Sequence, residues 1–161
     1  PTVLKVLPVL KRLKNIEVGI TITTSNDEIS RYFEKYAPNA SARIETLRKL
    51  NKERIKTYAF LGPLLPHFAT KKDKLKEILD LIHNTGTRRL FIEHINLSPY
   101  IKERMLKELK SENKEFLEEF YSAQSTDYRE EINKIISDLL KNYDFKLLHG
   151  EILYHKELSK K

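Results

Sequence analysis

The stretch that decides the fold is Val18-Gly19-Ile20-Thr21-Ile22-Thr23-Thr24. It is short, rich in β-branched residues and flanked by turn-forming polar residues, so it predicts a β-strand. Side chains alternate along a strand, which places Ile20 and Ile22 on one face and Thr21 and Thr23 on the other. The threonine face suits a barrel interior or a ligand cleft. The alternative is that threonine is present because it forms strands well.

Two more strands follow at similar intervals. The segments Ile55 to Leu61 and Leu90 to Leu97 are apolar and short, and helical patterns separate them from one another and from the first strand. Strands that alternate with helices predict parallel pairing through right-handed crossovers. The sequence therefore predicts an α/β fold around a three-stranded parallel sheet.

Capping patterns mark two of the intervening helices. Ser25 with Glu28, and Thr70 with Asp73, match the spacing of a capping box at a helix start. A further helix is expected from about Ser41 to Lys52, with one apolar stripe.

The C-terminal third is predicted to be mainly helical. A helix starting at Ser98 carries the stripe Ile101-Met105-Leu109, and a last helix near Asp127 carries Ile132-Ile135-Leu139. Both stripes need a surface on which to be buried. A short strand is expected within Leu147 to Tyr154.

Composition narrows the class of protein. The chain has 161 residues, which suits one domain, and a formal net charge of +7 at pH 7. The charges are mixed along the helices, which favours a solvated surface over a dedicated nucleic-acid patch, although nucleic acid stays among the partners considered. No apolar run is long enough to span a membrane, and no signal peptide is visible, so a cytoplasmic protein without membrane contact is expected.

Ligands of parallel α/β folds bind at the carboxyl ends of the strands. This rule gathers polar residues from all three strands at one mouth: Thr23, Thr24, Gly62, Glu93, His94 and Asn96. A carboxylate in an apolar strand, such as that of Glu93, costs several kcal/mol unless it is paired or solvated, so it predicts a polar lumen or site. A single strand histidine such as His94 is more often structural than a metal ligand.

Three pieces of sequence carry a resemblance to a known family. They are the first strand, the segment Tyr36-Ala37-Pro38-Asn39-Ala40-Ser41-Ala42-Arg43-Ile44-Glu45-Thr46-Leu47, and the loop Gly62-Pro63-Leu64-Leu65-Pro66. Together they resemble radical SAM proteins of the spore-photoproduct-lyase-like, or DNA-repair-photolyase-like, type. The resemblance implies a TIM-barrel-like partial (β/α)6 radical-SAM-type barrel. Residues 1–97 would be its last three βα units, and residues 98–161 a C-terminal helical extension of the same domain.

The resemblance also implies cofactors and a set of contacts. Full-length members bind S-adenosylmethionine and a [4Fe–4S] cluster held by three cysteines, whereas this chain has no cysteine. It is therefore not expected to bind iron or to cleave S-adenosylmethionine alone. The residues implied to border the cofactor are Thr21, Thr23, Leu61, Gly62, Leu64, Glu93 and Asn96. No catalytic residue is identified.

Two functions follow as expectations. The chain is either the C-terminal part of a radical SAM enzyme of the lyase type, lacking the cluster-binding half, or a stand-alone half-barrel that binds or assembles without catalysis, with nucleic acid as one partner class. In both cases the first strand would expose an unpaired edge, which predicts pairing with the missing N-terminal half or with a second copy.

Overall fold

The computed structural model describes residues 2–97, 103, 107 and 114–154. The stripe Ile101-Met105-Leu109 therefore lies outside the described residues. The elements are α1 (Thr2–Lys5), α2 (Leu7–Leu10), β1 (Glu17–Ile22), α3 (Asp27–Phe33), α4 (Ala40–Lys52), β2 (Lys56–Leu64), α5 (Lys72–His83), β3 (Arg89–His94), α7 (Lys114–Ser122), α8 (Thr126–Leu140), β4 (Lys146–Leu147) and the 3-10 turn η1 (Leu148–Gly150).

The strands form one parallel sheet in the order β1-β2-β3-β4. The register pairs Glu17 with Lys56 and Ile22 with Leu61, and then Ala59 with Leu90. The three predicted strands and their parallel pairing are confirmed. A fourth strand, β4, pairs with β3 at the far edge. The short strand predicted within Leu147 to Tyr154 is therefore only partly correct: β4 overlaps it at Leu147 alone, Leu148–Gly150 form a 3-10 turn, and an isolated bridge joins Glu93 to Leu153.

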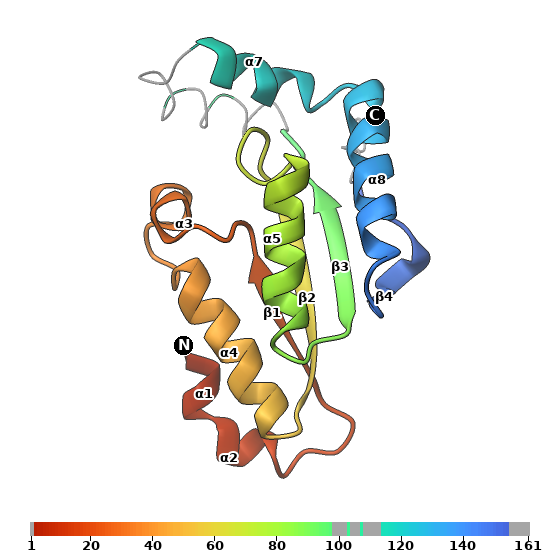
Figure 1. Cartoon of the computed structure of the whole chain (residues 1–161). Helices are drawn as coiled ribbons and strands as arrows, with labels where there is room; N and C mark the ends of the chain where they lie inside the picture. Colours follow the sequence, from red (N-terminus) through yellow and green to blue (C-terminus); the bar gives the residue numbers. More distant parts are fainter. Residues whose placement is uncertain (1, 98–102, 104–106, 108–113, 155–161) are drawn as a thin grey trace, which may run out of the picture.

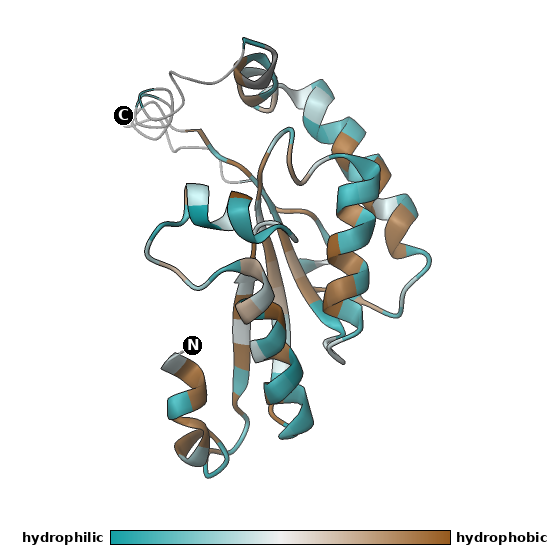
Figure 2. Ribbon diagram, turned by 60° about the vertical axis from the view of Figure 1, so that its left-hand side comes forward, coloured by the Kyte–Doolittle hydropathy of each residue, from teal (hydrophilic) through white to brown (hydrophobic). Residues whose placement is uncertain are grey.

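Helices α4, α5 and α8 cover one face of the sheet. The buried strand residues on this face, such as Leu61 and Ile92, form one hydrophobic core with the apolar stripe of each helix. In α5 this stripe is Leu75, Ile78, Leu79 and Ile82, all fully buried. In α8 it contains Ile132, Ile136 and Leu139, so the last predicted helix finds the surface that it needs. Figure 1 shows α4 and α5 lying in front of the strands, and in Figure 2 the apolar colour follows the strands.

The opposite face of the sheet is covered by none of these three helices. We call it the open sheet face. Burial alternates along the strands, with the more buried residues toward the helices and the less buried residues on the open sheet face. Its residues are Glu17, Gly19, Thr21, Tyr58, Phe60, Arg89, Phe91 and Glu93. Parallel sheets are usually covered on both faces, so this half-exposed face is the unusual feature of the fold.

Helices α3 and α7 lie at the carboxyl ends of the strands (Figure 1). The ring of Phe33 in α3 stacks on Phe120 of α7 with centroids 6.2 Å apart, and it meets the edge of Phe68 at 5.6 Å. His67 Nδ1 lies 3.1 Å from Glu119 Oε2 in the same region. The loop after β2 is thereby fixed between the two helices.

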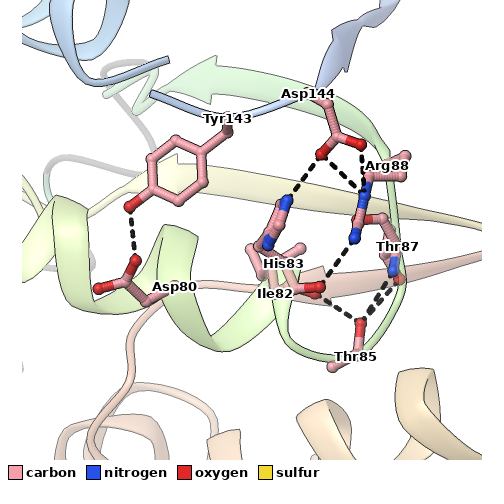
Figure 3. Close-up of polar contacts among 8 residues, drawn as sticks. All are labelled: Asp80, Ile82, His83, Thr85, Thr87, Arg88, Tyr143 and Asp144. Carbon is pink, nitrogen blue, oxygen red and sulfur yellow. Dashed lines mark hydrogen bonds and ion pairs between the residues drawn. The ribbon is translucent and has the colours of Figure 1, made fainter. Parts of the chain in front are cut away.

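A polar cluster near the start of β3 holds the segment that connects α8 to β4 (Figure 3). Asp144 accepts hydrogen bonds from His83 Nε2 at 2.6 Å and Arg88 Nε at 2.9 Å. The hydroxyl of Tyr143 donates to Asp80 Oδ1 at 2.7 Å. Burial and this hydrogen bond to Asp80 raise the pKa of Tyr143 to about 12, so the phenol stays protonated and keeps donating at neutral pH.

Two predicted helix caps are wrong. Asn26, not Ser25, caps α3: it has an extended backbone, and its Oδ1 accepts hydrogen bonds from the backbone N–H groups of Glu28 and Ile29. Helix α5 begins after Lys71 and has no side-chain cap. The hydroxyl of Thr70 instead accepts a hydrogen bond from Tyr128 of α8 at 3.0 Å.

No helix in the part of the chain that the structure describes is long and apolar enough to cross a membrane.

The carboxylate of Asp27 links α3 to the start of α4 through hydrogen bonds. It accepts hydrogen bonds from the Ser41 backbone N–H at 2.8 Å, the Ser41 hydroxyl at 2.7 Å and Asn39 Nδ2 at 2.6 Å. These donors, chiefly the Ser41 backbone N–H, lower the pKa of Asp27 below its usual value. An anion at a helix N-terminus is favourable in addition, because the helix dipole points its positive end there.

We expect the Asp27→Ala variant to lose about 1 kcal/mol of unfolding free energy at pH 7, the typical cost of a lost helix cap. Because the folded pKa is lowered, this stabilisation is present above the unfolded pKa of about 4 and disappears as the pH falls through the folded pKa. Urea unfolding of wild type and variant between pH 2 and pH 7 tests this. A gap between the two proteins that stays constant over that range would contradict the assignment.

Candidate functional site

The end of β1 is held by a partly buried ion pair. The guanidinium of Arg43, in α4, is 2.9 Å from Glu34 Oε1, donates to the Pro38 carbonyl at 2.6 Å and donates to the Thr21 carbonyl at 3.2 Å. Only 9% of the Arg43 side chain is exposed, against 27% for Glu34. The other carboxylate oxygen of Glu34 accepts a hydrogen bond from the Thr23 hydroxyl at 2.8 Å.

This network gives Thr23 a structural partner. Thr23 is buried just past the end of β1, and its hydroxyl is engaged with Glu34. Thr21 is exposed on the open sheet face, as the alternation predicted. Sequence reasoning missed the pairing of Arg43 with Glu34, since the two are separated by a helix start and no spacing rule links them. A usable signal was the short spacing between Pro38 and Arg43, because the Arg43 side chain donates a hydrogen bond to the Pro38 carbonyl.

The end of β2 offers little side-chain chemistry. Leu61 and Leu64 are buried in the core with the helices, so only their backbone groups could contact a ligand. Gly62 is explained by packing: a Cβ there would lie 3.0 Å from the Glu93 carbonyl oxygen and 3.1 Å from its Cβ. The glycine therefore lets β2 and β3 approach closely, and the peptide bond that follows it, to Pro63, is cis.

At the end of β3, the neighbouring polar residues Glu93 and His94 lie on opposite faces of the sheet. His94 is buried on the helix side, and its Nε2 lies 2.7 Å from Asn133 Oδ1 of α8. Burial lowers the pKa of His94 below its usual value, which keeps the ring neutral near pH 7, as a structural histidine requires. Glu93 is half-buried on the open sheet face, and Asn96 is half-buried beyond the strand.

Aromatic rings and one ion pair line the open sheet face. The ring of Tyr58 lies over Gly19, where an added Cβ would come within 2.1 Å of it, and its centroid is 5.3 Å from that of Phe91. His149 of η1 lies against the other side of this cluster, 4.9 Å from Phe91. Arg89 Nε is 3.1 Å from Glu17 Oε1 at the start of the strands. The face thus carries an ion pair toward the start of the strands, aromatic rings and Thr21 at its middle, and Glu93 toward the carboxyl ends.

The structure brings together only some of the predicted cofactor contacts. Thr21, Glu93 and Asn96 offer a hydroxyl, a carboxylate and an amide near the carboxyl ends of β1 and β3, and Gly62 lies between those strands. Thr23, Leu61 and Leu64 have side chains turned into structural contacts instead. Among the described residues, no group of three or more His, Cys, Asp or Glu could hold a metal ion. The arrangement suits a polar organic ligand that rests on the aromatic middle of the face.

Comparison with known proteins gives one relative for part of the chain. The uncharacterized protein MJ0683 of Methanocaldococcus jannaschii is 34% identical over 64 residues. The match covers 40% of this chain and 25% of the relative, so it involves about a quarter of that protein's length. No family model and no solved structure matches the chain.

We expect the Arg43→Ala variant to lose about 3 kcal/mol of unfolding free energy, because it leaves the partly buried Glu34 carboxylate and two carbonyls without their donor. The matched control is Arg48→Ala in the same helix, which breaks an exposed ion pair with Glu45 and should cost less than about 0.5 kcal/mol. Urea denaturation at pH 7 measures both. Equal losses in the two variants would show that the Arg43 network does not hold the end of β1.

Proposed function

We propose that this chain is the C-terminal part of a radical SAM enzyme of the spore-photoproduct-lyase-like type and contributes one wall of the barrel and part of the S-adenosylmethionine pocket. The observation that carries the proposal is a parallel sheet with its helices on one face and an open sheet face on the other. The quoted family resemblance of the first strand, the Tyr36 to Leu47 segment and the Gly62 to Pro66 loop supports the same reading.

The strand order supports a barrel over an open sheet. Right-handed crossovers that always step in the same direction place every connecting helix on the same face. The order β1-β2-β3-β4 has no reversal, whereas a doubly wound sheet reverses direction and carries helices on both faces. A singly wound sheet leaves its other face to become the interior of a barrel.

The residues of the open sheet face fit part of an S-adenosylmethionine pocket. The hydroxyl of Thr21 is exposed, and the Asn96 amide makes no hydrogen bond within the described part of the chain, so both can bind a polar ligand. Tyr58 and Phe91, whose rings meet edge to face, provide an apolar surface in the middle of the face. In this proposal the side chains bind and orient the cofactor, and the aromatic pair excludes water from it.

The iron–sulfur cluster does not fit this chain. Its usual ligands are thiolates, and the chain has no cysteine. Cluster ligands therefore have to come from residues outside these 161. When it is reductively cleaved beside such a cluster, S-adenosylmethionine supplies the radical chemistry of the family. No step of that chemistry is assigned to a residue of this chain.

The test begins with the residues encoded upstream of Pro1, where the proposal expects a three-cysteine motif. The full-length protein, purified without oxygen and reconstituted with iron and sulfide, should bind S-adenosylmethionine. We expect Thr21→Val and Asn96→Ala each to weaken binding about tenfold, the effect of one lost hydrogen bond, while iron content stays unchanged. Asn84→Ala is the matched control, because Asn84 is exposed at the C-terminal end of α5, away from the proposed pocket.

Equilibrium dialysis measures the cofactor affinity, and chromatography detects 5′-deoxyadenosine after reduction. An upstream sequence without the cysteine motif, or variants that bind as well as wild type, would contradict the proposal.

One observation favours a second candidate, a module that assembles with another polypeptide. Helices α1 and α2 are mostly apolar, yet none of their residues is buried, and Val6 and Val9 are 43% and 56% exposed. The outer edge of β1 has no strand beside it in the described part of the chain. Exposed apolar residues and unpaired strand edges both mark surfaces that bind other chains.

Sedimentation of the isolated chain over a dilution series tests this second candidate. We expect self-association that weakens when Val6 and Val9 are both replaced by Lys, because the substitution places charge in the contact. Lys35 and Lys134, which are exposed and already charged, can be changed to Glu as a control. A monomer at every concentration would contradict pairing with a second copy. The N-terminal half of the proposed barrel would then be the partner to test.

A further inference from the structure

Basic side chains gather along the edge of the sheet where the strands begin. All four strands are parallel, so the segments before β1, β2, β3 and β4 meet at this edge, opposite to the mouth. We call it the basic rim. Its cations are Lys11, Arg12, Lys14, Lys52, Arg54, Lys56, Arg88, Arg89 and Lys146.

The carboxylates on the basic rim are already engaged by ion pairs. Glu53 pairs with Lys11, Asp144 with Arg88, and Glu17 with Arg89. The other six cations of the rim are exposed and form no ion pair with any described residue. The rim therefore holds nine cations against three carboxylates, most of the +7 charge of the chain.

Helix dipoles explain only part of this charge. The C-termini of α4 and α5 face the rim, and cations in a last helical turn are stabilised there. Lys52 is in the last turn of α4. Arg12, Lys14, Lys56 and Lys146 lie outside helices, where no dipole accounts for them.

Arg54 stands at a position that favours glycine. Its φ is +59°, the left-handed conformation that commonly follows a helix end, and its N–H and that of Ile55 bond back to Asn51 and Leu50. An L-residue other than Asn or Asp is strained in this conformation, and glycine is the usual occupant. Arg54 thus adds a positive charge to the rim at a position where glycine would carry less backbone strain.

A hollow of about 270 Å³ lies at the β1–β2 end of the rim. It lies between α2 and the turn that joins α4 to β2, and Lys11, Arg54 and Lys56 line it together with Asn15. The hollow places cations from two separate segments, the end of α2 and the turn from α4 into β2, around one concave surface, which Glu53, the ion-pair partner of Lys11, also lines.

We propose that the basic rim binds the phosphate backbone of a nucleic acid. The rim is a line of cations along three strand spacings, about 14 Å. Duplex DNA carries one phosphate charge per about 1.7 Å of axis, so a duplex of that length carries about eight charges on its two strands together. A linear polyanion matches a rim one sheet thick, whereas an anionic membrane would need a broad flat surface. Contacts of this kind read the backbone and not the base sequence.

The sequence alone favoured a mixed, solvated surface because the cations are separated by as many as 135 residues and alternate with acids along the chain. Only the parallel sheet brings them together. The rim lies at the opposite end of the strands from the proposed cofactor pocket, so this inference does not depend on the proposed function.

Fluorescence anisotropy with a labelled 20-nucleotide DNA, titrated from 50 to 300 mM KCl, tests the proposal. The affinity of wild type should fall steeply with salt, by about 0.9 log unit per phosphate contact for each tenfold rise in salt. The Arg12→Glu, Lys14→Glu, Lys56→Glu triple variant should bind about 100-fold more weakly in 100 mM KCl. The matched control is Lys71→Glu, Lys72→Glu, Lys134→Glu, which makes the same charge change at exposed positions away from the rim and should weaken binding less than tenfold.

A second variant separates binding from folding. Arg54→Gly should raise the urea midpoint, because glycine relieves the backbone strain, while lowering DNA affinity several-fold. Three results would overturn the proposal: no DNA binding at 50 mM KCl, equal loss in the rim and control triples, or preferential binding of vesicles with 25% phosphatidylserine.

Discussion

The burial of a single face of a parallel sheet determines most of this structure. Leu61 and Ile92 in the strands and the stripe of α5 are fully shielded from water. Each such side chain contributes about 1.5–3 kcal/mol through burial. The strands step in one direction, so the connecting helices all lie on this face. The open sheet face, the mouth and the basic rim are consequences of this one-sided arrangement.

Polar interactions fix the two ends of the sheet differently. At the carboxyl ends, Arg43 and Glu34 hold the end of β1 against α4. Near the start of β3, Asp144 bonds to His83 and Arg88 and secures the segment that leads into β4. The mouth thus offers accessible groups beside a rigid network, while the opposite end carries an excess of cations.

The strands and the crossover helices were predictable because their signals are local. Alternation around Ile20 and Ile22 and the stripe of α5 each fall within one element, and helices between strands imply parallel pairing. The cap assignment for α3 failed because Ser25 and Asn26 are adjacent and equally suitable in type, and only the backbone conformation of Asn26 decides between them. The assignment for α5 failed because the Thr70 hydroxyl bonds to Tyr128 in a distant helix. The roles of Thr23, Arg43 and the rim cations depend on contacts between distant segments. The pattern within one element contains no information about these contacts.

The central claim is that the open sheet face is the inner wall of a larger barrel and not a surface made for water. Hydroxyl-radical footprinting of the isolated chain and of the full-length protein tests it most directly, with the fully exposed Tyr36 as the internal reference. The account predicts that Tyr58 and Phe91 are oxidised several-fold more slowly in the full-length protein, while Tyr36 reacts equally in both. Equal oxidation of Tyr58 and Phe91 in the two proteins would contradict it.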